Sequence, residues 1–482
     1  MNNMPFEWSV IDGIWVISWV VTLVSVPSVL HHRAGNPNAA LSWILALFAL
    51  PLVAAIIWWS FGRTHLRKKR RHKREASLKT SQTLQKTRSK LGALATQSSL
   101  VAENMFSIHQ LPYELHKAVF PATSGNHIEF LPCTKSVHQV WFDIIDSAQS
   151  HLHLLFFTWR DDAIGRSLRD CLIRKARQGI SVRVMYDAMG SISLPASFFS
   201  GLTQAGGNVA TFTPLSIVHT PSLNFRNHRK LLIVDGNTAY TGGVNVGDEY
   251  LTWQDIGLKL VGPAVNQLQE VFIEDWFYCT EEALTDSSYF YNTSDAFTNG
   301  HDAYCSVFAS GPDQRFNATR EMVFLAITQS RFRIWIATPY FIPDEALLLA
   351  LRTAVYRGVD VKILVPKQSD SWLVRWASKT YYYELLQAGV QIFEYQGMLH
   401  AKATIIDGTG GLIGSANLDS RSFKLNFELN TFVASEAVNE QLVNWYTRLL
   451  ASSDTISAND VELISYKERL ISSLAHLLSP LL

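Results

Sequence analysis

Two segments of the 482-residue sequence place the same residue types at the same spacing. Each segment has a His, a Lys two positions later, an Asp five positions after the Lys, and an Asn ten positions after the Asp. The members are His228, Lys230, Asp235, Gly243 and Asn245 in the first segment, and His400, Lys402, Asp407, Ser415 and Asn417 in the second. A pattern of this length rarely arises twice by chance, so we interpret the pair as an internal duplication.

These residue types suit chemistry at a phosphodiester. Two Lys and two Asn side chains around one phosphorus would supply fixed donors to the oxygens that gain charge during attack. One imidazole can attack phosphorus, while the other protonates the leaving alkoxide and then deprotonates the incoming alcohol. The ordinary histidine pKa of about 6.5 suits both tasks. Since the lysines take the place of a metal ion, we expect neither a metal nor another cofactor.

The sequence around each motif predicts how the motif is positioned. The apolar runs LLIV and ATII follow Lys230 and Lys402, so we expect buried strands there. Residues two apart in a strand face the same side, so each His and Lys should point together. A turn and a second strand would then bring the Asn back beside its His. Asp235 and Asp407 lie beyond the buried run and are therefore expected to be structural, not proton donors.

Upstream of each motif lies a βαβ pattern. Residues 152–187 and 332–366 each read as a strand, a polar loop, an amphipathic helix, a glycine and a second strand. Gly179 and Gly358 stand where a helix C-terminal cap is expected. The pattern predicts an α/β fold with parallel strands in each half.

The duplicated motif resembles the HxKx4Dx6GSxN signature of the phospholipase D superfamily. The first copy departs from it, because Gly243 replaces the serine and a hydroxyl contact is lost there. Flanking stretches are similar to bacterial cardiolipin synthases of the A type: YDAMGS from Tyr186, NHRK from Asn227, GGVNVGDEY from Gly242, ATPYFIPDE from Ala337 and the LDSRSFKLNFE stretch ending at Glu428.

The resemblance implies two fused αβ sandwich repeats with pseudo-two-fold symmetry, at residues 111–300 and 301–482. It also implies that the motif His, Lys and Asp residues are the catalytic set, with His228 as nucleophile and His400 as general acid and base. Asn245, Asn417, Ser415 and Gly243 would contact substrate. Two acids, Glu249 and Glu428, are expected to hydrogen-bond the imidazoles.

The implied reaction is a reversible phosphatidyl transfer between two phosphatidylglycerol molecules, which yields cardiolipin and glycerol through a phosphohistidine. The motifs alone also fit a membrane-bound phospholipase D, a phosphatidyltransferase of the phosphatidylserine synthase type, or a nuclease. A net charge of +1 disfavours a nucleic acid partner. The absence of GxSxG and GxxxxGK[ST] motifs disfavours serine hydrolysis and nucleoside triphosphate use.

The N-terminus favours a membrane anchor. Residues 14–30 and 39–61 carry no charge, so we expect two transmembrane helices within residues 1–62, the second kinked at Pro51. A basic run at 67–74 opens a juxtamembrane linker at 63–110, which predicts a cytoplasmic catalytic domain on the bacterial inner membrane, in contact with anionic lipids. Aromatic residues of the stretch 371–386 fit either a core helix or a membrane-facing helix.

The cysteines point to neither a disulfide framework nor a metal site. The four positions, Cys133, Cys171, Cys279 and Cys305, include no CxxC pair. Apolar residues make up 48% of the chain and charged residues only 17%, which is enough to fill large cores.

Overall fold

The computed structural model describes residues 10–34, 37–62, 118–212, 225–291, 303–463 and 465–477. The chain divides into a compact N-terminal unit and a larger unit that carries both motifs. The predicted linker and its basic run at 67–74 lie outside the described residues.

The N-terminal unit is a small helical cluster. Its elements are α1 (Val10–His32), α2 (Pro37–Ala49), α3 (Pro51–Ile57) and the π-helical turn η1 (Trp58–Gly62). Thr22 donates to the Leu47 carbonyl (3.2 Å), and the Trp58 indole donates to Ser28 (3.2 Å).

One helix of this unit, at Trp15–His32, is long and apolar enough to cross a bilayer. The expected second helix at 39–61 is not continuous. It is interrupted at Leu50, whose φ of −138° leaves the helical region directly before Pro51. Proline disfavours helical backbone in the residue that precedes it, so the break is sharper than the predicted kink.

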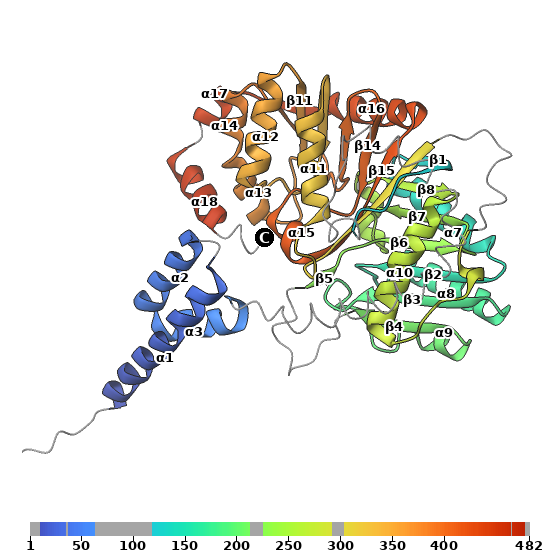
Figure 1. Ribbon diagram of the computed structural model, residues 1–482, viewed down its shortest axis with the longest axis horizontal. Coiled ribbons are helices and arrows are strands. Elements are labelled where there is room, and N and C mark those ends of the chain that lie inside the picture. The colour runs from blue at the N-terminus through green and yellow to red at the C-terminus, as the bar shows by residue number, and fades with distance from the viewer. Residues whose placement is uncertain are drawn as a thin grey trace, which may run out of the picture. The chain divides into compact units, whose positions relative to one another are not determined.

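The larger unit contains a 16-stranded sheet (Figure 1). The strands are β1 (Thr123–Leu131), β2 (His151–Phe156), β3 (Ser181–Asp187), β4 (Asn208–Phe212), β5 (Arg226–Asn227), β6 (Leu231–Val234), β7 (Thr238–Gly242), β8 (Gly257–Val261), β9 (Ala303–Ser310), β10 (Arg333–Ala337), β11 (Asp360–Pro366), β12 (Gln391–Tyr395), β13 (Ala403–Ile406), β14 (Gly410–Gly414), β15 (Asn426–Ala434) and β16 (Ser453–Ile456).

The sheet repeats one strand order in each half of the chain. From the centre outward the first half runs β1-β8-β7-β6-β2-β3-β4, and the second runs β9-β15-β14-β13-β10-β11-β12, followed by β16. The halves join where β1 pairs with β9, and the short β5 pairs in parallel with β15 of the opposite half.

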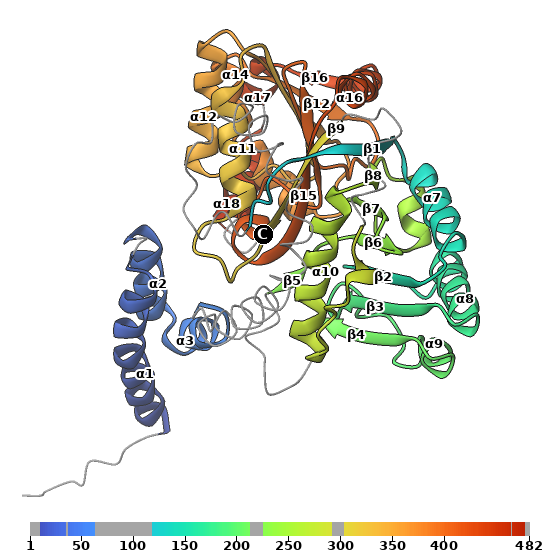
Figure 2. The same ribbon diagram turned by 45° about the vertical axis from the view of Figure 1, so that its right-hand side comes forward.

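Helices cover both faces of the sheet. They are α7 (Thr134–Asp146), α8 (Ala163–Arg177), α9 (Ser200–Gln204), α10 (Ala264–Thr280), α11 (Ala318–Gln329), α12 (Glu345–Tyr356), α13 (Trp372–Lys379), α14 (Tyr382–Gln387), α15 (Ser420–Lys424), α16 (Glu436–Leu450), α17 (Ala458–Glu462) and α18 (Tyr466–Leu477), with 3-10 turns η3 (Asp248–Thr252) and η4 (Ser287–Tyr289). Figure 2 shows α7, α8 and α9 along one face of the first half's strands and α10 along the other.

Both predicted βαβ units form. Strands β2 and β3 flank α8 and are parallel, and strands β10 and β11 flank α12 in the same way. Gly179 and Gly358 follow these helices with φ of 89° and 85°, a backbone conformation that glycine adopts without strain. The expectation of capping glycines is therefore confirmed.

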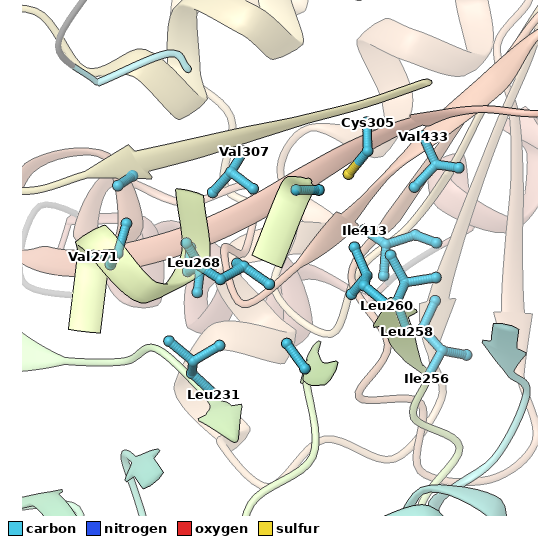
Figure 3. Packing of buried hydrophobic residues seen from close by; sticks show 14 of the residues in the cluster. Leu231, Ile256, Leu258, Leu260, Leu268, Val271, Cys305, Val307, Ile413 and Val433 are labelled. Carbon is cyan, nitrogen blue, oxygen red and sulfur yellow. The ribbon is translucent and has the colours of Figure 1, made fainter. Parts of the chain in front are cut away.

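One apolar core extends across the two halves. Figure 3 shows residues of β6, β8 and α10 from the first half packed near residues of β9, β14 and β15 from the second. Examples are Leu258 and Leu268 on one side, and Val307 and Ile413 on the other, all buried. The halves therefore fold as one body, which fixes the two motifs relative to each other.

The helix predicted from residue 371 forms as two short helices, α13 and α14, each partly buried in a core. On α13, Val374 and Ala377 are buried against Ala475 of α18, whereas Trp372 is 67% exposed. Tyr382 on α14 is buried in the core of the second half.

Candidate active site

Each His-x-Lys segment lies immediately before a hairpin, β6–β7 or β13–β14. In the first segment alternate residues face opposite sides. The Asn227 amide donates to Asp275 Oδ2 (2.8 Å), and the Arg229 guanidinium binds the same oxygen (2.6 Å). His228 and Lys230 occupy the other side, as the strand periodicity predicts. The Asp187 carboxylate accepts the Asn227 N–H (2.8 Å), which fixes the start of the segment.

Each motif histidine is held by the backbone of the opposite half. The His228 N–H donates to the Phe427 carbonyl (2.9 Å), and the His400 N–H donates to the Gln254 carbonyl (2.8 Å). Each half therefore helps to position the histidine of the other half, and neither histidine is positioned by its own half alone.

A carboxylate from the opposite half orients each imidazole. His228 Nδ1 lies 3.1 Å from Glu428 Oε2, and His400 Nδ1 lies 2.6 Å from Asp255 Oδ2. An Nδ1–H that donates to a carboxylate leaves the lone pair on Nε2. Both histidines are less than 10% exposed, so these contacts with the carboxylates are shielded from water.

The sequence prediction for the acid beside His400 was wrong. Glu249 is partly exposed and pairs with Arg160 (2.9 Å), away from both imidazoles. The residue that takes this place is Asp255. Asp255 directly precedes Ile256, whose carbonyl accepts the Gly243 N–H, just as Glu428 precedes Leu429, whose carbonyl accepts the Ser415 N–H.

The Asp255 carboxylate also explains why the first motif has Gly243 where the superfamily signature has a serine. A Cβ atom at Gly243 would lie 2.2 Å from Asp255 Oδ1, so a serine would displace this acid. In the second motif, the Ser415 hydroxyl instead donates to Glu428 Oε2 (2.5 Å) and accepts the Leu429 N–H (2.9 Å). The shorter aspartate with glycine and the longer glutamate with serine are two ways to fill the same volume.

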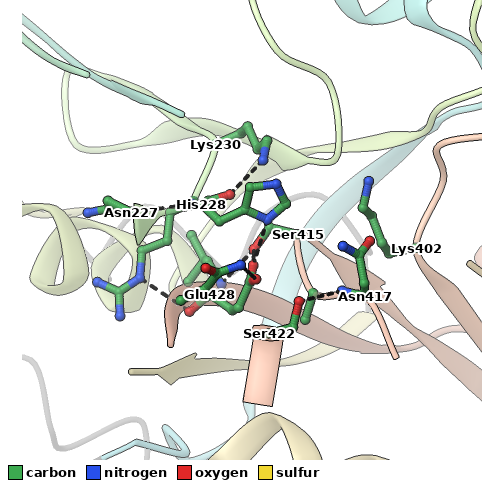
Figure 4. Close-up of polar contacts among 12 residues, drawn as sticks. Asn227, His228, Lys230, Lys402, Ser415, Asn417, Ser422 and Glu428 are labelled. Carbon is green, nitrogen blue, oxygen red and sulfur yellow. Dashed lines mark hydrogen bonds and ion pairs between the residues drawn. The ribbon is translucent and has the colours of Figure 1, made fainter. Parts of the chain in front are cut away.

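Each motif lysine contacts the histidine of its own motif. Lys230 Nζ donates to the His228 carbonyl (2.7 Å), and Lys402 Nζ donates to the His400 carbonyl (2.5 Å) while lying 2.9 Å from each ring nitrogen of His400. Figure 4 shows His228, Lys230, Glu428, Lys402 and Asn417 together, drawn from both halves. We call His228, Lys230, Glu428, His400, Lys402 and Asp255 the histidine cluster.

Burial and like charge dominate the electrostatics of the histidine cluster. Burial, and after it Lys230, lower the pKa of His228 to about 4. Burial and Lys402 likewise lower the pKa of His400. Burial lowers the pKa of Lys402 to about 8 and that of Lys230 well below its ordinary value. An anion placed among these groups would be stabilised, because it supplies the negative charge that the two lysines lack.

The motif asparagines are both buried. Asn245 Oδ1 accepts the Thr158 N–H (3.3 Å). Asn417 Oδ1 accepts no hydrogen bond from the part of the chain that the structure describes, although the residue is only 6% exposed. A buried amide with an unused polar atom is costly unless a ligand completes it.

The motif aspartates lie away from the histidine cluster, at the far ends of β6 and β13. Asp235 accepts the N–H groups of Gln149, Ser150 and His151, each at 2.8 Å. The Asp407 carboxylate accepts the N–H groups of residues 331–333, at 2.7–3.1 Å. Both carboxylates therefore hold the starts of β2 and β10, which agrees with the structural role expected from their position and replaces the catalytic role that the resemblance implied.

Comparison with known proteins identifies similar sequences. A family model described as "Cardiolipin synthase, PLD-like domain" matches residues 142–276 and 323–450. A cardiolipin synthase from Alkalihalophilus pseudofirmus is 34% identical over 479 residues, which cover 98% of this chain and 94% of the relative. One from a Geobacillus species is 34% identical over 492 residues and covers 100% and 96%.

Among solved structures, a phosphatidylserine synthase from Haemophilus influenzae has a similar fold. Its TM-score is 0.59 at 14% identity, and the match covers 74% of this chain and 95% of that chain. At this identity the likeness describes the fold alone.

Proposed function

The chain belongs to the phospholipase D superfamily, in its family of cardiolipin synthases, and from this premise we propose that it joins two phosphatidylglycerol molecules into cardiolipin and glycerol. Its activity is that of a phosphatidyltransferase. The observation that carries the proposed mechanism is the pair of buried imidazoles, each oriented by a carboxylate of the opposite half.

In the first step, His228 Nε2 attacks the phosphorus of one phosphatidylglycerol. The P–N bond forms as the P–O bond to the headgroup glycerol breaks, and His400 gives its proton to the departing oxygen. The low pKa keeps His228 neutral and nucleophilic near pH 7. His400 has a lowered pKa as well, so it takes up its proton together with the anionic substrate, whose charge favours the imidazolium.

In the second step, His400 removes a proton from the headgroup hydroxyl of a second phosphatidylglycerol. That oxygen attacks the phosphorus, the P–N bond breaks, and His228 is regenerated. Lys230, Lys402 and the amides of Asn245 and Asn417 stabilise the charge on the equatorial oxygens in both steps. Each step inverts phosphorus, so the overall reaction retains its configuration.

We also infer that the two halves are fused phospholipase D-type repeats, a proposal supported by the common strand order. The N-terminal unit would anchor them as a multi-pass segment, with the catalytic unit in the cytoplasm. The apolar side chains that α1, α2 and α3 expose, such as Leu23, Leu45 and Ile56, support contact with lipid. The basic run in the sequence after residue 62 favours anionic lipid partners.

Purified protein with labelled phosphatidylglycerol, in the absence of nucleotide, tests the function. We expect labelled cardiolipin and an equal amount of free glycerol. Phosphatidic acid as the main product would instead identify a phospholipase D. Activity only with an activated lipid and serine would identify a phosphatidylserine synthase type.

A further inference from the structure

A half-buried arginine, Arg226, stands next to the histidine cluster. Arg226 lies two residues before His228 on β5, and its guanidinium makes no hydrogen bond or ion pair within the described ranges. Residues two apart on an extended segment share a face. Arg226 is also the register partner of Asn426, whose amide donates to Glu428 Oε1 (3.0 Å). Arg226 therefore emerges on the face that carries His228 and Glu428.

A second arginine lies close to the first. Arg421 is on α15, and its carbonyl accepts the Leu425 N–H (2.8 Å) one turn before Asn426, the partner of Arg226. Burial, and after it the charge of Arg421, lower the pKa of Arg226. The nearby Asp187 carboxylate raises the pKa of Arg226, and it also accepts the N–H groups of Met189, Gly190 and Asn227. Two guanidinium groups therefore lie close together here, near the Asp187 carboxylate, whose charge acts on both.

The pair breaks the symmetry of the site. Met398 stands two residues before His400, where the first half has Arg226, and Glu249 stands four residues after Asn245, where the second half has Arg421. Glu249 is paired with Arg160. The catalytic groups are duplicated, but the two arginines occur on one side only. Such asymmetry suits a reaction in which two like molecules have different roles.

We propose that Arg226 and Arg421 form a second anion site, which binds the phosphodiester of the acceptor lipid, the phosphate that does not react. The inference rests on the proposed function, because only a phosphatidylglycerol acceptor brings a second phosphate to the enzyme. That phosphate lies one glycerol unit, roughly 5–6 Å, from the reacting oxygen. Two residues of extended chain separate Arg226 from His228 by a similar roughly 6.6 Å. Guanidinium groups bind phosphate oxygens in pairs, which suits this task.

The test compares a charged with a neutral acceptor. Cardiolipin formation from phosphatidylglycerol requires both phosphates, whereas exchange of labelled glycerol into phosphatidylglycerol requires only the reacting one. We expect Arg226→Gln and Arg421→Gln to lower cardiolipin formation by about tenfold to a hundredfold, with glycerol exchange retained within about twofold. Arg226→Lys should restore part of the loss, because it keeps the charge. Arg174→Gln, on the exposed side of α8, serves as the matched control.

Retained exchange also shows that a variant is folded. Equal loss of both reactions would overturn the proposal, since the arginines would then serve the reacting phosphate or the fold. Unchanged cardiolipin formation would overturn it as well. Wild-type protein that exchanges glycerol but forms no cardiolipin would refute the proposed function, and the acceptor site with it.

Discussion

At the scale of residues, the motif histidines differ from the other buried histidines by their partners. His153, for example, is stacked on Phe272 (centroids 4.6 Å apart) and contacts the Gln269 amide, and its pKa is lowered by burial. His228 and His400 each have a carboxylate on Nδ1 and a lysine beside them. A carboxylate fixes the tautomer, so these two rings present Nε2 to a substrate.

Asp255 and Glu249 give a direct comparison between an orienting acid and an exposed one. We expect Asp255→Asn to lower turnover by about a hundredfold or more, because the amide no longer stabilises the His400 imidazolium and changes its preferred tautomer. Glu249→Gln should retain activity within about threefold, since it loses only a partly exposed ion pair. Steady-state cardiolipin synthesis by the two variants measures this. Similar losses in both would contradict the assignment of Asp255.

The pH dependence should be set on its alkaline side by the lysine pair. Burial lowers the pKa of Lys402 to about 8, so the free enzyme loses this positive charge as the pH rises through about 8. A neutral lysine stabilises the phosphate less, so kcat/KM should fall above pH about 8. Bound substrate is anionic and raises the pKa of the lysine. The alkaline decrease in kcat should therefore occur at a higher pH than the decrease in kcat/KM. A kcat/KM profile that is flat to pH 10 would contradict this.

At the scale of elements, the motif aspartates connect the hairpins to the βαβ units. Asp407→Ala removes the acceptor for three backbone N–H groups and places alanine at φ 50°, so we expect a loss of about 2–4 kcal/mol in the free energy of unfolding. Asp407→Asn keeps one acceptor oxygen and tolerates this φ, so it should lose less. Thermal unfolding in detergent measures both. Turnover per folded molecule should stay near wild type, and its abolition in a folded variant would indicate a catalytic aspartate.

The sequence predicted those elements that local pattern determines. The βαβ units and the hairpins after Lys230 and Lys402 follow from apolar periodicity and turn glycines. The pairing of β5 with β15 and the position of Asp255 beside His400 depend on contacts between distant parts of the chain, which no local pattern encodes. A signal for Asp255 existed: it follows Asn245 by ten residues, and Glu428 follows Asn417 by eleven. The sequence predicted only a kink at Pro51 in the second apolar segment, whereas the structure has a full break in the helix at Leu50.

At the scale of the whole molecule, the pairing of β1 with β9 makes one body of the two halves, and the N-terminal helices form a separate unit. Our proposed topology places the turn between α1 and α2 outside the cell and the catalytic unit inside. Single cysteines at the exposed positions Ala34 and Tyr356, in a background without the four native cysteines, report on this. In intact cells an impermeant maleimide should label Ala34→Cys only, and lysis should allow labelling of Tyr356→Cys. The reverse pattern would contradict the topology.

The central claim is that one histidine carries the phosphatidyl group between two lipids. The measurement that tests it most directly is rapid quenching of the protein during turnover with phosphatidylglycerol labelled in its phosphatidyl group, followed by identification of the labelled peptide. We predict label on the peptide that contains His228 in the wild type and none in His228→Ala. His400→Ala should still acquire label from a substrate with a good leaving group, because only protonation of the leaving group is lost. Label on His400 would reverse the two roles, and rapid cardiolipin synthesis with no label on either histidine would contradict the covalent mechanism.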